Sequence, residues 1–461
     1  TTLHLARGDY TMAGFALRDL YMKSPIRLQQ WMTTLYGMKL WQERYGRTYE
    51  RELVVLANRP KDGAVVAADQ LKRLNAFLEF CATHNAYYQK LFEENEIVLP
   101  LQSMEELKRI PILEKETVRK NPDIHSNIKT DILGRTGGTT GTSLQVHFTK
   151  EDYQRRMAHV DFFKAQHGFT RGMKRASFTG RKICNPNQEK PVFWRYNRPL
   201  NQMLFSLYHV NPQTIPHYID ALNRFKPIVL DSAPSAMIEI AKYIKENQIP
   251  LEFQLMAIFP TAETITPQGR AILEEAFNAP VFDQYASSEG APILTECTHG
   301  NMHLHHETGV IESYGDHEEI LVTSFTTHGT PLVRYRIGDR MKIGEGTCAC
   351  GQGGTFVTSI EGRESNYVLT PNKQKIYEGD LTTVVRVLPN SVIQTQYRQH
   401  DLYHIELKYV PDLERFKPEH EEIMRSELEL LFGKEVMITL TPVQSIPRGP
   451  NGKVIVIDKT A

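Results

Sequence analysis

Short apolar runs alternate with amphipathic stretches between residues 227 and 282, and this alternation restricts the possible folds more than any other feature. The apolar runs lie at 227–231, 255–259 and 281–282, and the amphipathic stretches lie at 235–244 and 267–277. Strand, helix, strand, helix, strand is typical of a parallel sheet covered by helices. In such sheets ligands bind beyond the carboxyl ends of the strands. Polar loops at 261–263 and 285–290 begin at such ends and are therefore candidate binding loops.

The segments on either side of this alternation differ, because the first predicts a layer of helices and the last predicts a separate, smaller domain. Residues 1–100 have apolar positions at helical spacing, and a Ser103/Glu106 capping box predicts a further helix that Pro111 limits. After residue 362 we expect a strand near Val392, a strand at 403–410, a helix at 418–432 and a strand at 436–440. A chain of 461 residues exceeds the usual size of a single core. We expect an α/β fold with a large N-terminal domain of helix-covered sheets, 1–362, and a small, mobile α+β domain, 363–461.

Charge and cysteine content exclude several classes of protein. The chain has 54 basic and 54 acidic residues, so no net field attracts it to nucleic acid or to an anionic membrane. It has no apolar run of the roughly 18 residues that a membrane span needs. Five cysteines in a chain of this length argue against a disulfide framework. We expect a cytoplasmic protein with reduced thiols.

The segment Thr136-Gly137-Gly138-Thr139-Thr140-Gly141-Thr142-Ser143 is the strongest chemical signal. Its glycines allow sharp turns that bring backbone N–H groups to a polyphosphate, and its hydroxyls add donors. It lacks the Lys-Ser/Thr pair of a P-loop. The alternative for this segment taken alone is a polar hairpin turn.

This loop resembles the phosphate loop of the adenylate-forming superfamily, and within it the branch of phenylacetate-CoA ligase-like and CapK proteins. Further segments resemble the family's motifs in the family's order. These are 110–115 before the loop, Thr261-Ala262-Glu263, the segment 284–290, Arg334 to Asp339, Glu361-Gly362-Arg363 and 447–453. The resemblance covers most of the chain.

The resemblance implies a ligase that uses ATP to convert a carboxylic acid, aryl or arylacetic in the parent branch, into acyl-AMP with release of pyrophosphate. The acyl group then passes to coenzyme A. A rotation of the C-terminal domain about 362–365 takes the enzyme from the first step to the second. Two alternatives stay open. In the first alternative, the acyl acceptor is an amine or a carrier protein. In the second, the chain is a catalytically silent, zinc-stabilised binding relative.

The resemblance also implies roles for individual residues. Lys453 stabilises charge between the carboxylate and the α-phosphate, Glu289 holds Mg²⁺, and Ser288 donates to the α-phosphate. The predicted ATP/AMP-binding residues are Thr136, Gly137, Gly138, Thr139, Thr140, Gly141, Ala262, Glu263, Tyr285, Asp339 and Arg363. Asp339 would accept from the ribose diol, and Tyr285 would stack on adenine. The competing interpretation is a helix-capping serine for Ser288 and a core aromatic for Tyr285. For Asp339, Arg363 and Lys453 it is a charged side chain at the surface.

Cysteines and histidines form a separate signal. Cys297 and His303 flank a glycine turn, and Cys348-Ala349-Cys350 follows about 45 residues later. Three thiolates and an imidazole suit a structural Zn²⁺ site. His299, His305 and His306 compete for the imidazole position, and free thiols in a glycine-rich loop are the alternative.

The sequence departs from the family pattern at two places. Thr142 stands where many members have lysine in the phosphate loop, and Glu364-Ser365-Asn366 replaces the usual acidic hinge residue. Tyr208, His209 and Phe259 are candidates for the acid pocket. Which acid is the substrate and whether the chain forms a homodimer stay open.

Overall fold

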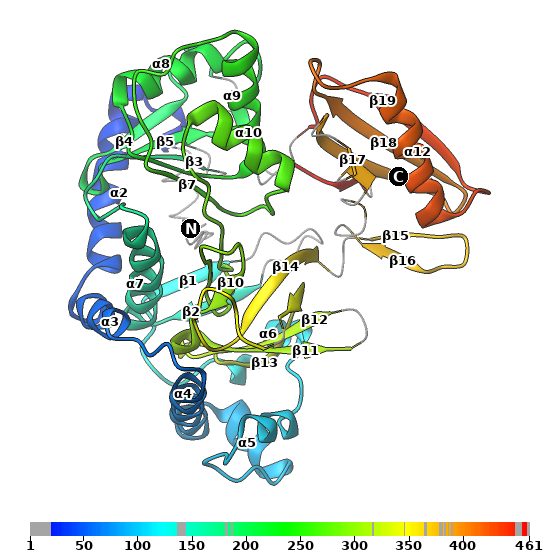
Figure 1. Cartoon of the computed structure of the whole chain (residues 1–461). Helices are drawn as coiled ribbons and strands as arrows, with labels where there is room; N and C mark the ends of the chain where they lie inside the picture. Colours follow the sequence, from blue (N-terminus) through cyan, green and yellow to red (C-terminus); the bar gives the residue numbers. More distant parts are fainter. Residues whose placement is uncertain are drawn as a thin grey trace.

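The computed structural model shows a large N-terminal part that contains two sheets, and a smaller C-terminal part beside it (Figure 1). The described residues are 20–135, 144–179, 183–185, 188–315, 318–344, 346–363, 367–377, 381, 384–385, 387–388, 391–447 and 454–458.

Helices dominate residues 20–100, in agreement with the predicted helical spacing. They are α2 (Ile26–Arg44), α3 (Arg47–Ala57), α4 (Gly63–His84) and α5 (Ala86–Glu94). The predicted apolar face of α4 is buried, including Leu74, Phe77, Leu78 and Cys81. Asp62 caps this helix because its carboxylate accepts from the backbone N–H groups of Ala64 and Val65.

The capping box predicted at Ser103 is wrong. Residues Met104–Arg109 form a short 3-10 helix, and the Ser103 side chain makes no capping hydrogen bond. The Glu106 carboxylate instead accepts from the backbone N–H of Gln102, at 2.8 Å. Since both groups are local and exposed, this alternative turn competes directly with a longer helix. The short helix α6 (Lys115–Lys120) follows.

The strand and helix alternation forms the predicted parallel sheet, except that the third predicted strand, 281–282, contributes only an isolated bridge between Val281 and Ile258 of the last strand. Strands are ordered β4 (Trp194–Asn197), β5 (Gln202–Ser206), β3 (Arg175–Thr179), β6 (Val229–Ser232) and β7 (Ala257–Pro260). All pairs are parallel except β4 with β5. Helices α8 (Ile215–Phe225), α9 (Pro234–Glu246) and α10 (Pro267–Phe277) pack against it through a shared apolar core. Helix α7 (Lys150–Gln166) reaches β6 through an ion pair between Lys164 and Asp231.

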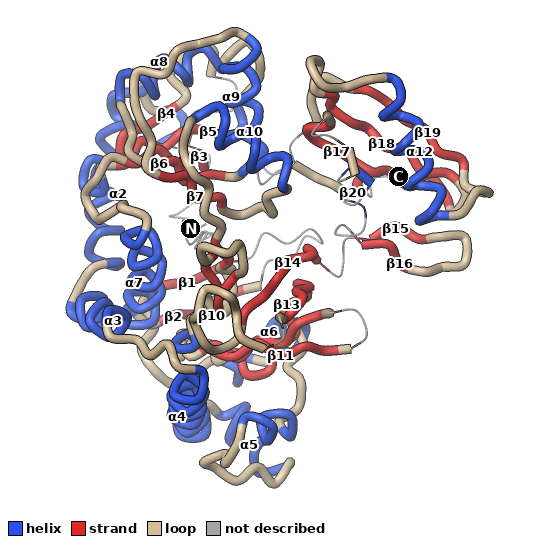
Figure 2. The backbone as a smooth tube through the Cα atoms, in the orientation of Figure 1, coloured by secondary structure: helices blue, strands red, loops and turns tan. Residues whose placement is uncertain are grey.

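A second, antiparallel sheet was not anticipated. Its order is β11 (Gly309–Tyr314), β12 (Glu319–Ser324), β13 (Leu332–Ile343), β14 (Phe356–Arg363), β10 (Met302–Leu304), β9 (Leu294–Glu296) and β8 (Gln284–Tyr285). A separate hairpin, β1 (Ile132–Arg135) and β2 (Gln145–Phe148), flanks the predicted phosphate loop. Figure 2 shows these strands below the parallel sheet.

The C-terminal part has its own sheet, in the order β19 (Met437–Pro442), β18 (His404–Pro411), β17 (Val392–Asp401) and β20 (Ile457–Asp458). Helix α12 (Pro418–Phe432) covers this sheet and matches the predicted range. A distinct core includes Leu407, Met424 and Leu428. A hairpin of β15 (Tyr367–Leu369) and β16 (Lys375–Tyr377) lies next to it.

No helix in the described part of the chain combines the length and the apolar character needed to cross a bilayer.

Candidate active site and metal centre

The turn that follows β7 has an unusual backbone conformation. Ala262 has φ of +72°, in the left-handed region that non-glycine residues rarely adopt. The backbone N–H of Thr261 donates to the carbonyl of Ser232 at 2.9 Å, so the turn is tied to the neighbouring strand. Strain of this kind is found at ligand-binding turns. Ala262 is exposed, and so the backbone of this predicted nucleotide-binding turn is accessible.

Glu263 turns its side chain toward the start of α9. One carboxylate oxygen accepts from the backbone N–H of Ser235 and the other from the Ser235 hydroxyl, both at 3.0 Å. The N-cap residue of α9 is Ala233, which has no side-chain acceptor, so Glu263 supplies the missing cap from a distant loop. The second oxygen also accepts from the backbone N–H of Val454 at 3.3 Å.

Two of the predicted motifs meet at one edge of the antiparallel sheet, the edge at which β14 ends. The Tyr285 hydroxyl donates to the Asp339 carboxylate at 2.6 Å. Asp339 and Arg363 are paired across β13 and β14, so the two predicted nucleotide-binding positions share one register. Asp339 is 9% exposed, and therefore a buried carboxylate at this sheet edge, unlike an ordinary surface turn aspartate.

Glu289 connects three segments of the chain. It is 1% exposed, and its two carboxylate oxygens contact the Lys115 ammonium at 3.0 Å and the Tyr335 hydroxyl at 2.7 Å. Lys115 begins α6 and Tyr335 lies in β13. A buried carboxylate needs such partners, since an unpaired charge is costly. Lys115 and Tyr335 had no predicted role, although both lie within segments that resemble the family's motifs.

Arg156 of α7 holds the loop that carries Glu289. Its Nη1 donates to the carbonyls of Gly290 and Ala291, both at 2.9 Å, and to the Thr326 hydroxyl at 3.0 Å. Its Nε and Nη2 atoms are buried and have no hydrogen-bond partner among the described residues. Burial lowers the pKa of this guanidinium to about 10. A buried guanidinium that donates hydrogen bonds to two carbonyls of one loop holds that loop in place.

Several predicted site residues lie outside the described part of the chain. These are Thr136, Gly137, Gly138, Thr139, Thr140, Gly141 and Lys453. Ser288 is half-buried on the loop next to Glu289. Their roles, and those of the other predicted nucleotide-binding residues, stay predictions.

The three candidates for the acid pocket lie in different environments. Phe259 is fully buried in an apolar cluster with Phe163, and so belongs to the core. The His209 ring contacts the Ser206 hydroxyl at 2.8 Å and the Asn185 carbonyl at 3.1 Å. Tyr208 and His209 follow β5 at its carboxyl end, the edge at which ligands of a parallel sheet bind. Burial raises the pKa of the Tyr208 hydroxyl.

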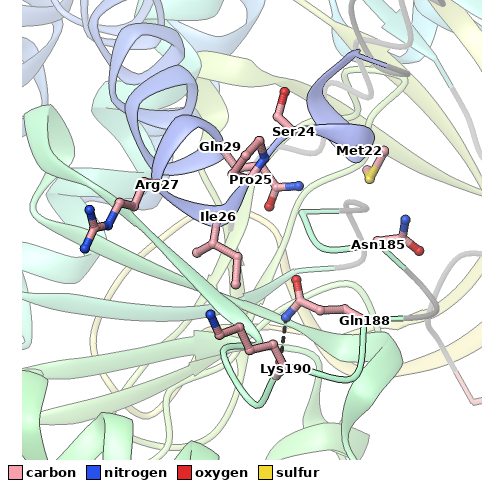
Figure 3. A pocket seen from close by; sticks show the side chains of 9 residues that line it. All are labelled: Met22, Ser24, Pro25, Ile26, Arg27, Gln29, Asn185, Gln188 and Lys190. Atoms are coloured by element: carbon pink, nitrogen blue, oxygen red, sulfur yellow. Dashed lines mark hydrogen bonds between the residues drawn. The ribbon is translucent and has the colours of Figure 1, made fainter.

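A cavity of about 600 Å³ lies at the start of α2 (Figure 3). Its lining includes Arg27, Gln29, Gln188 and Lys190, and none of the sequence-predicted site residues.

The predicted metal ligands form one cluster. One donor atom each from Cys297, His303, Cys348 and Cys350 lie within 4.8 Å of one another. The Cys297 and Cys348 sulfurs are 3.8 Å apart, and the Cys350 sulfur is 3.3 Å from His303 Nε2. Zn–S bonds of about 2.3 Å in a tetrahedron place two sulfurs roughly 3.8 Å apart. The donor set and the spacing therefore fit a zinc ion.

The local backbone supports these sulfurs as acceptors. The N–H of His299 points to Cys297 Sγ at 3.4 Å, and that of Gln352 points to Cys350 Sγ at 3.5 Å. The competing histidines are engaged elsewhere or exposed. His305 bonds to His159 and Thr295, His306 bonds to Asp69, and His299 lies at the surface. Of these histidines, His303 is the one that lies with the three cysteines in the cluster.

Comparisons with known proteins identify relatives over most of the chain. Residues 368–459 match a family model described as the CapK C-terminal domain. The chain is 35% identical over 443 residues to protein CapK of Staphylococcus aureus, covering 95% of this chain and 98% of that protein. It is 21% identical over 435 residues to the phenylacetate-coenzyme A ligase of Thermus thermophilus, covering 83% of this chain and 94% of that protein.

A solved structure has the same fold. The chain resembles 2-hydroxyisobutyryl-CoA ligase in its postadenylation state with a TM-score of 0.67 and 16% identity, over 85% of this chain and 89% of that one. These findings confirm the family resemblance and the fold class. The chain belongs to the CapK family, a distant relative of phenylacetate-CoA ligase that has the fold of the adenylate-forming ligases.

Proposed function

We propose that this protein activates a carboxylic acid, with an aryl or arylacetic acid as the first candidate, as its acyl-AMP. It releases pyrophosphate and then transfers the acyl group to the thiol of coenzyme A. The observation that carries the proposal is the pair of contacts between the segment 285–290 and the segment 335–339. Tyr285 bonds to Asp339, and Glu289 bonds to Tyr335. Two tyrosine hydroxyls therefore fix two buried carboxylates at one edge of the sheet.

In the first step the substrate carboxylate attacks the α-phosphate of ATP. Ala262 and Tyr285 bind the adenine side, and Asp339 accepts from the ribose. Asp339 already accepts from Tyr285 through Oδ2, which orients the carboxylate before the ribose arrives. Ser288 donates to the α-phosphate, and Lys453 stabilises the charge that develops there. Such reactions depend mainly on positioning and electrostatics.

Glu289 is the proposed ligand of Mg²⁺, and its surroundings fit this role. A carboxylate that already lies beside an ammonium and a hydroxyl is a hard oxygen donor of the kind that Mg²⁺ accepts. When bound, Mg²⁺ neutralises phosphate charge. Lys115 holds the Glu289 carboxylate in place and adds positive charge beside it. The phosphate loop of this chain has Thr142 in place of the usual lysine.

The second step requires the C-terminal domain, proposed as 363–461, to rotate about 362–365 and withdraw Lys453. This opens a path for the coenzyme A thiol. We also propose that Zn²⁺ binds Cys297, His303, Cys348 and Cys350. The metal would join the β9–β10 turn to the loop between β13 and β14, the strands that carry Asp339 and Arg363. Its role is to brace the nucleotide subsite.

The test measures pyrophosphate release with a panel of carboxylic acids, with and without coenzyme A. We expect release with at least one acid, and a thioester only when coenzyme A is present. The Lys453→Ala variant should lose acyl-adenylate formation, whereas the nearby Lys459→Ala variant should keep it. Release of pyrophosphate without a thioester would indicate an amine or carrier-protein acceptor. No release with any acid, and normal nucleotide binding, would indicate a silent binding relative.

A further inference from the structure

We propose that Glu263 is a positioning residue that fastens the C-terminal domain in the arrangement used for adenylation. This inference rests on the proposed function, because it assigns the residue to one of the two half-reactions. Sequence resemblance placed Glu263 at the adenine turn through its backbone. The side chain instead lies between helix α9 of the large domain and Val454 of the C-terminal segment.

The contact with Val454 is specific. Glu263 Oε1 accepts from both the Ser235 hydroxyl and the Val454 backbone N–H, while Oε2 accepts from the Ser235 backbone N–H. Val454 directly follows Lys453 in the sequence. Consecutive Cα atoms are about 3.8 Å apart, so the Glu263–Val454 bond fixes the backbone next to Lys453. The Val454 side chain also packs against the core of α9 and α10.

The other end of the same segment belongs to the C-terminal sheet. The carbonyl of Val456 accepts from the N–H of Tyr397 at 2.7 Å, and that of Ile455 accepts from Gln396 Nε2 at 2.9 Å. Arg398 Nε donates to Asp458 at 2.9 Å. Five residues, 454–458, therefore connect Glu263 of one domain to β17 of the other.

Other contacts also join the two domains. Gln268 Nε2 donates to the Val385 carbonyl at 3.1 Å, and Arg415 approaches Glu275 at 3.4 Å. Ile393, Val410 and Ile446 share the apolar core of α9 and α10. The interface is held mostly by non-directional packing, which tolerates sliding. Among these contacts, the Glu263 bond involves Val454, the residue that directly follows Lys453 in the sequence.

This geometry makes the bond dependent on the domain arrangement. If the C-terminal domain rotates, the Val454 N–H leaves Glu263, while both bonds to Ser235 can remain because they lie within the large domain. Glu263 therefore favours the adenylation arrangement and has no contact to lose in the transfer arrangement. Its removal should slow acyl-AMP formation more than thioester formation.

The test uses the full chain and three variants. Glu263→Gln weakens the acceptor, Ser235→Ala removes only the hydroxyl bond within the large domain, and Arg415→Ala removes the peripheral ion pair. Hydrogen exchange of residues 454–458 and of α9 is measured without substrate. Acyl-AMP formation and thioester formation from preformed acyl-AMP are then measured separately.

We expect Glu263→Gln to speed exchange of residues 454–458 about tenfold or more, with little change in either the Ser235→Ala or the Arg415→Ala variant. Adenylation should fall about tenfold in Glu263→Gln and transfer should be unchanged or faster. Wild-type exchange at residues 454–458 in Glu263→Gln, or equal opening in Ser235→Ala, would overturn the inference. If exchange changes as expected but the wild type makes no acyl-AMP, the fastening of the domain stands and the proposed function fails.

Discussion

The two sheets of the large domain are built for different tasks. The parallel sheet is buried on both sides, and β6 and β7 are buried at every position. The antiparallel sheet is also closely packed, but its edge carries Tyr285, Asp339 and the neighbouring Glu289. The parallel sheet belongs to the buried core, and the antiparallel sheet supplies most of the described polar groups of the proposed site.

This difference shows how one domain separates stability from chemistry. Continuous apolar strands can be replaced only at a cost in packing. Paired polar groups at a sheet edge contribute less to folding and more to binding. Substitutions in the first sheet should therefore reduce stability, and substitutions at the edge of the second should reduce activity.

The largest effect is expected for Lys164→Met in the parallel sheet. Lys164 Nζ and Asp231 Oδ2 are 2.7 Å apart and both side chains are fully buried. Burial raises the pKa of Asp231, but the Lys164 ammonium more than offsets this and holds it well below its usual value. Removing one partner of a buried pair costs about 3–5 kcal/mol. Urea unfolding should show this loss, and the exposed Lys90→Met variant should lose about 0.5 kcal/mol or less.

The same pair predicts acid sensitivity. A depressed carboxylate pKa stabilises the fold above the unfolded pKa, and this stabilisation is lost as the pH falls through the folded-state pKa. Wild type should therefore lose stability in acid more steeply than Lys164→Met. Parallel acid profiles for the two proteins would show that the pair is not the cause.

Glu289→Gln should have the next largest effect, at the edge of the second sheet. The amide removes the charge opposite Lys115 and the proposed cation ligand. We expect adenylation to fall about a hundredfold while the melting temperature changes by only a few degrees. The matched control is Glu116→Gln, an exposed carboxylate next to Lys115. Equal losses of stability and activity would mean that Glu289 is structural.

Cys348→Ser tests whether the second sheet depends on a metal. Mass spectrometry of the metal content should find about one zinc per chain in the wild type and little in the variant. Activity should fall roughly tenfold, because the loop between β13 and β14 loses its brace. Cys184→Ser, outside the cluster, should retain the zinc. A wild-type protein free of zinc after purification in zinc-supplemented medium would rule out the site.

Asp283→Asn should produce a pH-dependent gain in stability. Burial, with a contribution from Glu296, raises the pKa of the Asp283 carboxyl to about 7. The unfolded carboxyl ionises near pH 4, so wild type loses stability as the pH rises from about 4 to 7. Asparagine has no such loss. The melting temperature of the variant should exceed that of wild type at pH 8 and equal it below pH 4, and a constant difference would contradict this assignment.

The amino-acid sequence was enough to predict strands β6 and β7 of the parallel sheet, the helix at 418–432 and the family motifs, and it singled out the cysteines and His303 as a candidate metal cluster. These features depend on local patterns. Apolar runs predict buried strands because their neighbours in the chain are enough to define them. Cysteine and histidine identity indicates metal binding wherever the ligands meet.

Only the tertiary structure decided which polar groups are partners. Lys115 and Glu289 are 174 residues apart, and Glu263 and Val454 are 191 apart. The seven-stranded sheet also pairs β14 with β10, whose partners Met302 and Val357 are 55 residues apart. A hydrogen bond between distant residues forms only after the chain has closed around a shared core. No local sequence pattern indicates such a bond, and so these contacts of the proposed site were found only in the structure.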